Sequence, residues 1–417
     1  MEKQVLPNGL TLLYEKVPSV RSASIGVWLK LGSRHERPRN GGVCHFIEHL
    51  VFKGTATRSA RDISLLSDRI GGNVDAFTSK EVTCFHAKVL DEHLPIAADL
   101  LGDMVRNSLF DAVELERERM VILEEIKMVR DSPDDRLSEL FSETFWPAHP
   151  LGRPIGGTPE SIRGMSRKTV MNWHRRAYVP QNLLIAVAGR ITAKSRRAIE
   201  KAFAAIEPGR AIPTGRPPRW KPGVVRENRR EMEQVQLLLG IPGLPVGHPD
   251  RFIFHMLNTV LGGTISSRLF HRIREERGLA YAVSSGLNSH VGAGVLVVHA
   301  GTAPGQTREV VMLILDELRD LATHEIAEEE LAVARDHVKG NVLLGLESTA
   351  SRMHRLAREE MTIGRHYRVE ELVQEIERVT PADVHRLAQE KFAGVSAGLA
   401  LIGRVGRIKI DASELRL

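Results

Sequence analysis

The chain has few cysteines and no paired ones. Its 417 residues include only Cys44 and Cys84, and no Cys-x-x-Cys pair occurs. Two isolated thiols are typical of a protein from a reducing compartment, and they exclude a disulfide framework and a cysteine-pair metal site. Cys44 adjoins a histidine, but we expect it to be a small apolar residue on the buried side of a helix.

Targeting and membrane segments are also missing. No apolar run approaches 18 residues, which excludes a transmembrane helix, and the N-terminal residues form neither a signal peptide nor a presequence. The net charge is +6, but the basic residues are scattered among acidic ones without interleaved aromatic residues. Nucleic acid is therefore not an expected partner. We predict a cytoplasmic protein without a membrane partner.

The composition is that of an ordinary globular protein, and the length indicates two domains. Hydrophobic residues make up 42% of the chain and charged residues 26%, and 417 residues fit two domains of about 200 residues each. The segment 209–222 is rich in proline and glycine, which deny it regular structure. We therefore predict one domain at 1–208, a linker at 209–222 and a second domain at 223–417.

The two halves repeat one coarse pattern. The strand-like run Ser24–Ser33 precedes a loop and a short apolar helix around His45, and Val235–Pro242 precedes an apolar helix for which Asp250 is the expected N-cap. Each half continues with strands, then long helices, and ends on a late strand. This order predicts an α+β fold of two similar α/β-sandwich domains, each with an antiparallel-rich sheet and helices packed on one side.

The sharpest chemical signal is the string His45-Phe46-Ile47-Glu48-His49. On a helix the two histidines are four residues apart on one face, and Glu48 projects beside them. Two neutral imidazoles with a nearby carboxylate suit a zinc ion that keeps an open position for water, and H-x-x-E-H is the inverted form of a common zinc hydrolase motif. The alternative is a helix whose histidines are capped or solvated. The second half has no such pair, so only the first half is expected to bind metal.

A third ligand is expected on the amphipathic helix at 114–129. Its apolar stripe contains Glu118 and Glu125, which are two turns apart on one face beside Ile122. An acid on a core-facing stripe costs desolvation free energy unless it meets a cation. We therefore predict that Glu125 is a metal ligand and that Glu118 assists the site without binding the metal. Geometry alone leaves Glu124 open as the alternative ligand.

These segments resemble the M16 metallopeptidases over essentially the whole chain. Within the family the chain is most similar to the half-size M16B group, which contains the mitochondrial processing peptidase β-subunit and bacterial relatives. The residues that carry the resemblance are 45–55 and 118–125. It implies a zinc-dependent endopeptidase that cleaves peptides or unfolded segments inside a clamshell chamber, with one Zn²⁺ per chain.

The resemblance also implies roles for these residues. His45, His49 and Glu125 would hold the zinc, because Glu125 stands 76 residues after His49, the separation typical of the family. Glu48 would act as the catalytic base, and Glu118 would support catalysis.

Residues 71–79 resemble the family's loop and edge strand that pair with bound peptide. The resemblance implies that Asp75, Ala76 and Phe77 bind substrate. The family usually has asparagine where Asp75 stands, so the side-chain contact there differs while backbone pairing would persist. The alternative is an ordinary glycine-rich turn followed by a strand.

Residues 266–281 resemble the family's arginine/tyrosine segment. Arg274 and Tyr281 match the pair that contacts substrate and polarises the scissile carbonyl. Without the resemblance they would be interpreted as a surface arginine and a packed tyrosine.

Half-size family members build their chamber from two chains. Because this chain has both the zinc motif and the Arg274/Tyr281 pair, we expect a homodimer in which each site is completed in trans. The rival hypotheses are a non-catalytic M16-like structural subunit, a presequence-processing subunit of a heterodimer, and a metal-binding module unrelated to hydrolysis.

Overall fold

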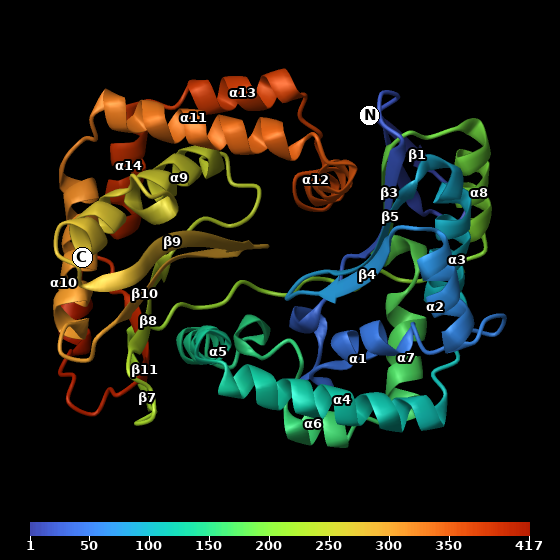
Figure 1. Ribbon diagram of the computed structural model, residues 1–417, viewed down its shortest axis with the longest axis horizontal. Helices are drawn as coiled ribbons and strands as arrows, with labels where there is room; N and C mark the ends of the chain where they lie inside the picture. Colours follow the sequence, from blue (N-terminus) through green and yellow to red (C-terminus); the bar gives the residue numbers. More distant parts are fainter. The chain divides into compact units, whose positions relative to one another are not determined.

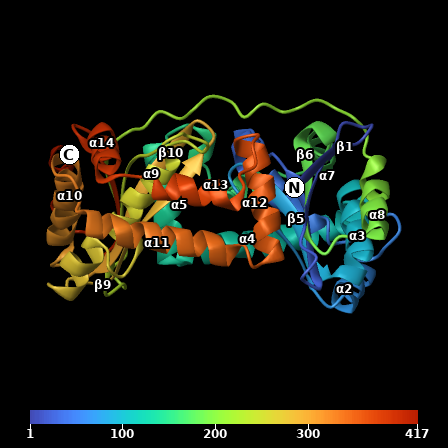
Figure 2. The ribbon, with the colours of Figure 1, turned by 90° about the horizontal axis from the view of Figure 1, so that it is seen from above.

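The computed structural model describes residues 1–417, which form two compact units, each built around one sheet (Figures 1 and 2). Both units are discontinuous in sequence. The first comprises 1–128, 153–215 and 344–366, and the second comprises 129–152, 216–343 and 367–417. Each sequence half therefore gives one segment to the unit formed mainly by the other half.

The first unit contains a six-stranded sheet in the order β1-β2-β6-β3-β5-β4. Neighbouring strands are antiparallel except for β2 and β6, which are parallel. The strands are β1 (Glu2–Val5), β2 (Thr11–Lys16), β3 (Ser22–Leu29), β4 (Asn73–Thr78), β5 (Thr83–Leu90) and β6 (Leu183–Gly189). The helices are α1 (Val43–Leu50), α2 (Ala60–Arg69), α3 (Leu94–Asn107), α4 (Ala112–Asp131), α6 (Pro159–Arg163), α7 (Arg167–Ala177), α8 (Ala193–Ala204) and α12 (Thr349–Thr362).

Both faces of this sheet are covered, as Figure 2 shows. On β3, Ile25 and Val27 point into the main core on the side of α3, whereas Trp28 points into a smaller core on the side of α12. This alternation follows from the two-residue period of a strand. The Ser24 hydroxyl lies 2.9 Å from the Thr349 hydroxyl and ties α12 to the sheet.

The second unit contains a five-stranded sheet in the order β7-β11-β8-β10-β9, in which only β7 and β11 are parallel. Its strands are β7 (Gly223–Asn228), β8 (Val235–Pro242), β9 (Ala280–His290), β10 (Ala293–Thr302) and β11 (Gly398–Gly403). Its helices are α5 (Pro133–Phe145), α9 (Arg251–Asn258), α10 (Thr307–Thr323), α11 (Glu328–Gly345), α13 (Val369–Glu377) and α14 (Pro381–Phe392). α10 and α14 cover one face of this sheet and α5 covers the other (Figure 1).

The exchanged helices fit their sheets closely. α5 follows α4 in sequence but packs on β8 and β11 of the second sheet. Phe141 lies directly over Gly240, where an added Cβ would come within 2.3 Å of the ring. Only glycine leaves room for this contact, so the sequence of β8 is matched to α5.

The predicted α+β fold with two similar, antiparallel-rich domains is confirmed. The structure adds one helix on the opposite face of each sheet. One of the five crossings between the units lies between Gly215 and Arg216, within the predicted linker segment. Asp250 stands at the N-cap position of α9, as predicted, but its side chain makes no capping hydrogen bond and instead lies 3.3 Å from Arg386. None of the helices has the length and apolar character needed to cross a bilayer.

Candidate metal centre

Helix α1 presents the histidine motif on its outer face. The helix buries its apolar side in the main core of the first unit, which fixes its rotation about its own axis. The buried residues are Val43, Cys44, Phe46, Ile47 and Leu50. His45, Glu48 and His49 lie partly exposed on the other side. In Figure 1, α1 lies between the edge strand β4 and helix α4.

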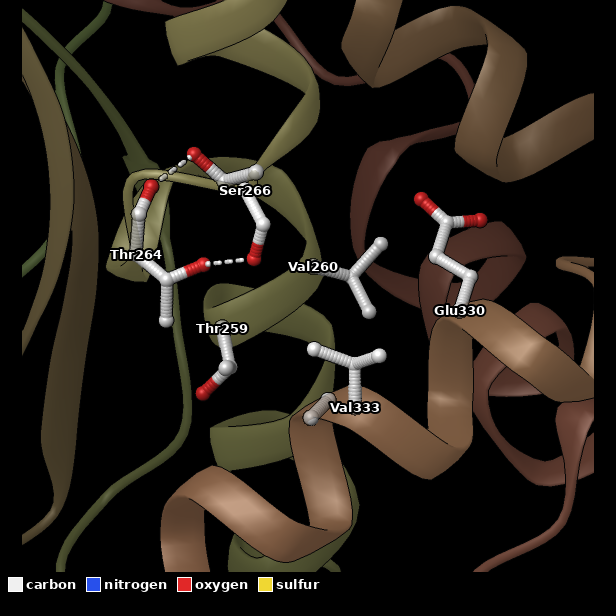
Figure 3. Close-up of a pocket in the computed structure, with 8 residues that line it drawn as sticks. Thr259, Val260, Thr264, Ser266, Glu330 and Val333 are labelled. Carbon is white, nitrogen blue, oxygen red and sulfur yellow. Dashed lines mark hydrogen bonds between the residues drawn. The ribbon is translucent and has the colours of Figure 1, made fainter.

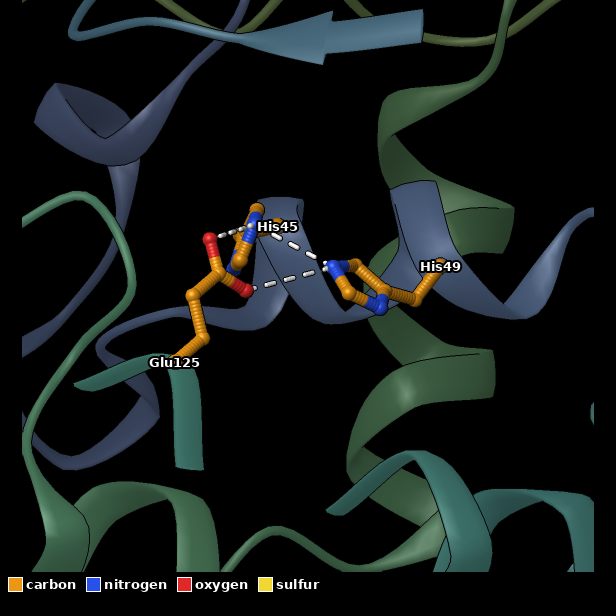
Figure 4. A group of neighbouring side chains, drawn as sticks. All are labelled: His45, His49 and Glu125. Carbon is orange, nitrogen blue, oxygen red and sulfur yellow. Dashed lines mark hydrogen bonds and ion pairs between the residues drawn. The ribbon is translucent and has the colours of Figure 1, made fainter. Parts of the chain in front are cut away.

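His45, His49 and Glu125 form a compact triangle of donor atoms (Figure 4). The two Nε2 atoms are 3.3 Å apart, and they lie 3.5 Å and 3.6 Å from the two carboxylate oxygens of Glu125. Ligands of a tetrahedral zinc ion with bonds of about 2.0–2.1 Å are separated by about 3.3–3.4 Å. The residues present therefore fit Zn²⁺ and would supply three of the four ligands of a tetrahedral site.

The rotation of α4 brings Glu125, rather than Glu124, to the histidines. Ile122 and Ile126 are buried in the core and Glu125 lies beside them, half-buried. Glu124 points to solvent and pairs with Lys127 at 2.6 Å. Of the two acids left open by the sequence, only Glu125 lies within reach of the histidines.

Glu118 reaches the far side of the His49 ring. Its Oε2 lies 3.0 Å from Nδ1 of His49, and its Oε1 lies 2.7 Å from Nζ of Lys53. When Nδ1–H donates to this carboxylate, Nε2 keeps its lone pair for a metal, and the ring orientation is fixed. Sequence reasoning did not identify Lys53, because a lysine after an apolar helix carries no distinctive pattern.

Burial sets the protonation states of the motif. Burial lowers the pKa of His45 to about 4, and the charge of His49 makes a smaller contribution in the same direction. A neutral imidazole is the form that binds metal. Burial also raises the pKa of Glu48, although a hydrogen bond with Thr78 opposes this shift. A carboxylate whose pKa lies above its ordinary value is a stronger proton acceptor near neutral pH.

The lowered pKa of His45 predicts an acid-sensitive metal-free protein. Because the unfolded chain binds a proton at this residue more readily, stability is lost as pH falls from about 6.5 towards 4. The shift corresponds to at most about 3 kcal/mol. Urea unfolding of the metal-free protein at pH 7 and pH 4.5 should show a smaller loss for His45→Gln than for the wild type. An equal loss of unfolding free energy in both proteins would show that His45 is not the group responsible.

The predicted substrate strand is an edge strand in the structure. β4 is the outermost strand of its sheet and pairs only with β5. Within β4, the Asp75 carboxylate accepts a hydrogen bond from the Ala76 N–H at 2.8 Å. Phe77 packs near Trp28 and His354, with ring centroids 5.8 and 6.0 Å away. The strand thus has a free edge and packs next to α1, which carries the two histidines.

Arg274 and Tyr281 lie together in the second unit. Arg274 belongs to the π-helical turn Phe270–Glu275, and its guanidinium carbon lies 5.4 Å from the centroid of the Tyr281 ring. Tyr281 is 80% exposed. The tyrosine is therefore not the packed residue of the alternative interpretation.

The second unit also contains a small pocket between the π-helical turn Thr259–Gly263 and α11 (Figure 3). Hydroxyl and apolar side chains line it, together with Glu330, which pairs with Arg268 at 2.7 Å. No histidine or cysteine is among the lining residues. The pocket therefore does not repeat the donor set of the first unit.

Family models match most of the chain. The model described as insulinase (peptidase family M16) matches residues 11–159, and the model described as the peptidase M16 inactive domain matches residues 164–338. The first match contains the donor triangle, and the second lies mainly in the half without it.

Curated relatives cover the whole length. An uncharacterized zinc protease of Bacillus subtilis is 41% identical, over 98% of this chain and 99% of that protein. An uncharacterized zinc protease of Streptomyces coelicolor is 38% identical, over 97% of this chain and 89% of that protein.

Solved structures show the same fold. A protease from Helicobacter pylori aligns with a TM-score of 0.87 at 23% identity, covering 96% of this chain and 98% of that one. A chain of complex III₂ from Candida albicans aligns with a TM-score of 0.85 at 18% identity, covering all of both chains.

Proposed function

The chain belongs to the insulinase family of peptidases, family M16, and on this premise we propose that it is a zinc-dependent endopeptidase that cleaves peptides or unfolded polypeptide segments. The observation that carries the proposal is the His45–His49–Glu125 triangle, with Glu48 on the same helix face. Three ligands and an open fourth corner are the arrangement of a catalytic rather than a structural zinc site.

In this mechanism the chain's own residues move the proton. A bound zinc ion supplies Lewis-acid polarisation of the scissile carbonyl and lowers the pKa of water. Glu48 accepts the proton of the attacking water and later delivers it to the leaving amine. Burial raises the pKa of Glu48, which favours proton uptake. Glu118 holds the orientation of His49 through its Nδ1 atom.

The substrate adds as a further strand beside β4. The free edge of β4 offers main-chain hydrogen-bonding groups to an extended peptide, as in other cases of strand addition. The Ala76 N–H is bonded to the Asp75 carboxylate in the absence of peptide.

Arg274 and Tyr281 act on the carbonyl from a second copy of the chain. The mutual proximity of these side chains and the exposure of Tyr281 support this role, because an oxyanion needs accessible donors. We propose a homodimer whose chamber admits unfolded chains. A solution mass equal to one chain at assay concentration would contradict this arrangement. Two buried unpaired thiols support a cytoplasmic location.

The fold alone does not separate an enzyme from a structural subunit. The same fold occurs both in a protease and in a chain of complex III₂. The intact donor triangle and the relatives named as zinc proteases favour the enzyme.

Metal removal tests the proposal. Purified protein should contain about one zinc ion per chain and cleave a mixed library of unstructured peptides, because three ligands retain the ion. Dialysis against a chelator should abolish cleavage, and added zinc should restore it. The measurements are metal content by atomic emission and cleavage by mass spectrometry. Stoichiometric zinc without cleavage of any peptide would instead favour the non-catalytic subunit, and absence of zinc binding would refute the metal centre.

A further inference from the structure

Glu36 lies in the loop between β3 and α1, and its buried carboxylate contacts the start of the metal-binding helix. Its Oε2 accepts a hydrogen bond from the Gly42 N–H at 2.7 Å, and its Oε1 accepts one from the Cys44 N–H at 2.8 Å. The residue is only 4% exposed. The first N–H groups of a helix have no partner within the helix. Glu36 therefore supplies from outside the cap that Gly42, which has no side chain, does not provide.

The other side of this first turn is also fixed. Gly42 has a φ of +87°, and an added Cβ would lie 2.5 Å from the carbonyl oxygen of Gly156. The start of α1 is thus held between the Glu36 carboxylate and the Gly156 carbonyl. His45 follows Cys44 directly, so a shift of this turn would displace a metal ligand.

Glu36 is itself anchored to the hairpin of the substrate strand. Its carbonyl oxygen accepts a hydrogen bond from Arg153 at 2.6 Å, and the Arg153 carbonyl in turn accepts one from Lys80 in the turn between β4 and β5. In the same loop, the Arg34 N–H donates to the Lys80 carbonyl at 2.7 Å. One hydrogen-bond network therefore joins the metal-binding helix to the strand that would receive peptide.

The position is costly for a carboxylate. No arginine or lysine hydrogen-bonds to it, and burial raises its pKa to about 7, even though the Cys44 and Gly42 N–H groups and the charge of Arg153 oppose the shift. A residue with a merely structural role would be at least as well served by an uncharged group. The two hydrogen bonds that it accepts from backbone N–H groups at the start of α1 explain why a glutamate occupies this position.

From this geometry we propose that Glu36 is a positioning residue of the metal centre: by capping the first turn of α1 it holds His45 in place for metal binding and catalysis. The inference rests on the proposed function, because it assumes that the triangle binds zinc. Glu36→Gln is the test variant. It keeps the size of the side chain but presents an NH₂ group to one of the two N–H donors, so that one bond is lost.

For Glu36→Gln we expect a zinc dissociation constant about 10- to 100-fold higher than that of the wild type in chelator-buffered titrations, the range found when a group that orients a ligand is removed. With zinc at saturation, kcat should fall while KM for peptide stays unchanged, because Glu36 does not contact the peptide edge. The melting temperature of the metal-free protein should change little, because removal of a buried charge offsets the loss of one backbone hydrogen bond.

Glu81→Gln is the matched control. Glu81 pairs with Arg34 in the same network, whereas the N–H groups of Gly42 and Cys44 bond to Glu36, so the Glu81 variant should bind zinc as the wild type does. A loss of zinc affinity equal to that of Glu36→Gln would overturn the proposal. It would also be overturned by wild-type affinity in Glu36→Gln, or by a fall in melting temperature with unchanged affinity of the folded protein. A wild-type protein that binds no zinc would instead refute the proposed function.

Discussion

Glu48→Gln should lower kcat by a factor of about 10² to 10⁴ while zinc remains bound, the range expected when a general base is removed. Glutamine has nearly the same shape as glutamate but accepts no proton from water. Glu48 is not part of the donor triangle, so metal content should stay at the wild-type level. The measurements are initial cleavage rates on an unstructured peptide and zinc content of the same samples.

The unchanged metal content distinguishes this result from damage to the site. Glu48 is partly buried, and its Oε2 has no hydrogen-bond partner. The neutral side chain therefore breaks no hydrogen bond at that atom and removes a charge from a desolvated position, so a loss of stability is not expected. Cleavage by Glu48→Gln at the wild-type rate would show that another group moves the proton.

The motif on α1 could be predicted because a helix imposes its own geometry. His45, Glu48 and His49 share a face by the 3.6-residue period alone, and the structure places them there. Glu125 was harder to predict, because the rotation of α4 about its own axis decides which acid faces the histidines. Val121 is as apolar as its neighbour Ile122, yet its side chain is 48% exposed, so the apolar residues alone do not fix which side of α4 faces the core. An error of one residue in the stripe is the difference between Glu125 and Glu124.

The exchange of α5 and α12 left only an indirect trace in the sequence. An amphipathic pattern shows that a helix face is buried but not which sheet buries it. The trace lies in the strands: β6 and β11 consist entirely of apolar residues and glycine, all of them buried, and a strand that is apolar on both sides requires cover on both faces of its sheet. Glu36 had no such signal, because a side chain that caps a helix from a distant loop follows no period.

The second large effect concerns the third ligand. Glu125→Gln should raise the zinc dissociation constant by at least about 100-fold, more than loss of an orienting group costs, because it replaces an anionic oxygen donor that faces both histidines by a neutral amide. Glu124→Gln is the matched control, since the same chemical change occurs one residue away at an exposed side chain paired with Lys127.

Competition titration with a zinc chelator measures both variants, and cleavage rates at low free zinc should follow the same order. In the Glu125→Gln variant the Nε2 atoms of His45 and His49 stay 3.3 Å apart, because α1 is unchanged. Excess zinc should therefore restore part of the activity. The reverse order, with Glu124→Gln losing zinc and Glu125→Gln retaining it, would mean that α4 is rotated by one residue relative to the histidines. Because Ile122 and Ile126 would then leave the core, that outcome would contradict the packing of the whole helix as well as the identity of the ligand.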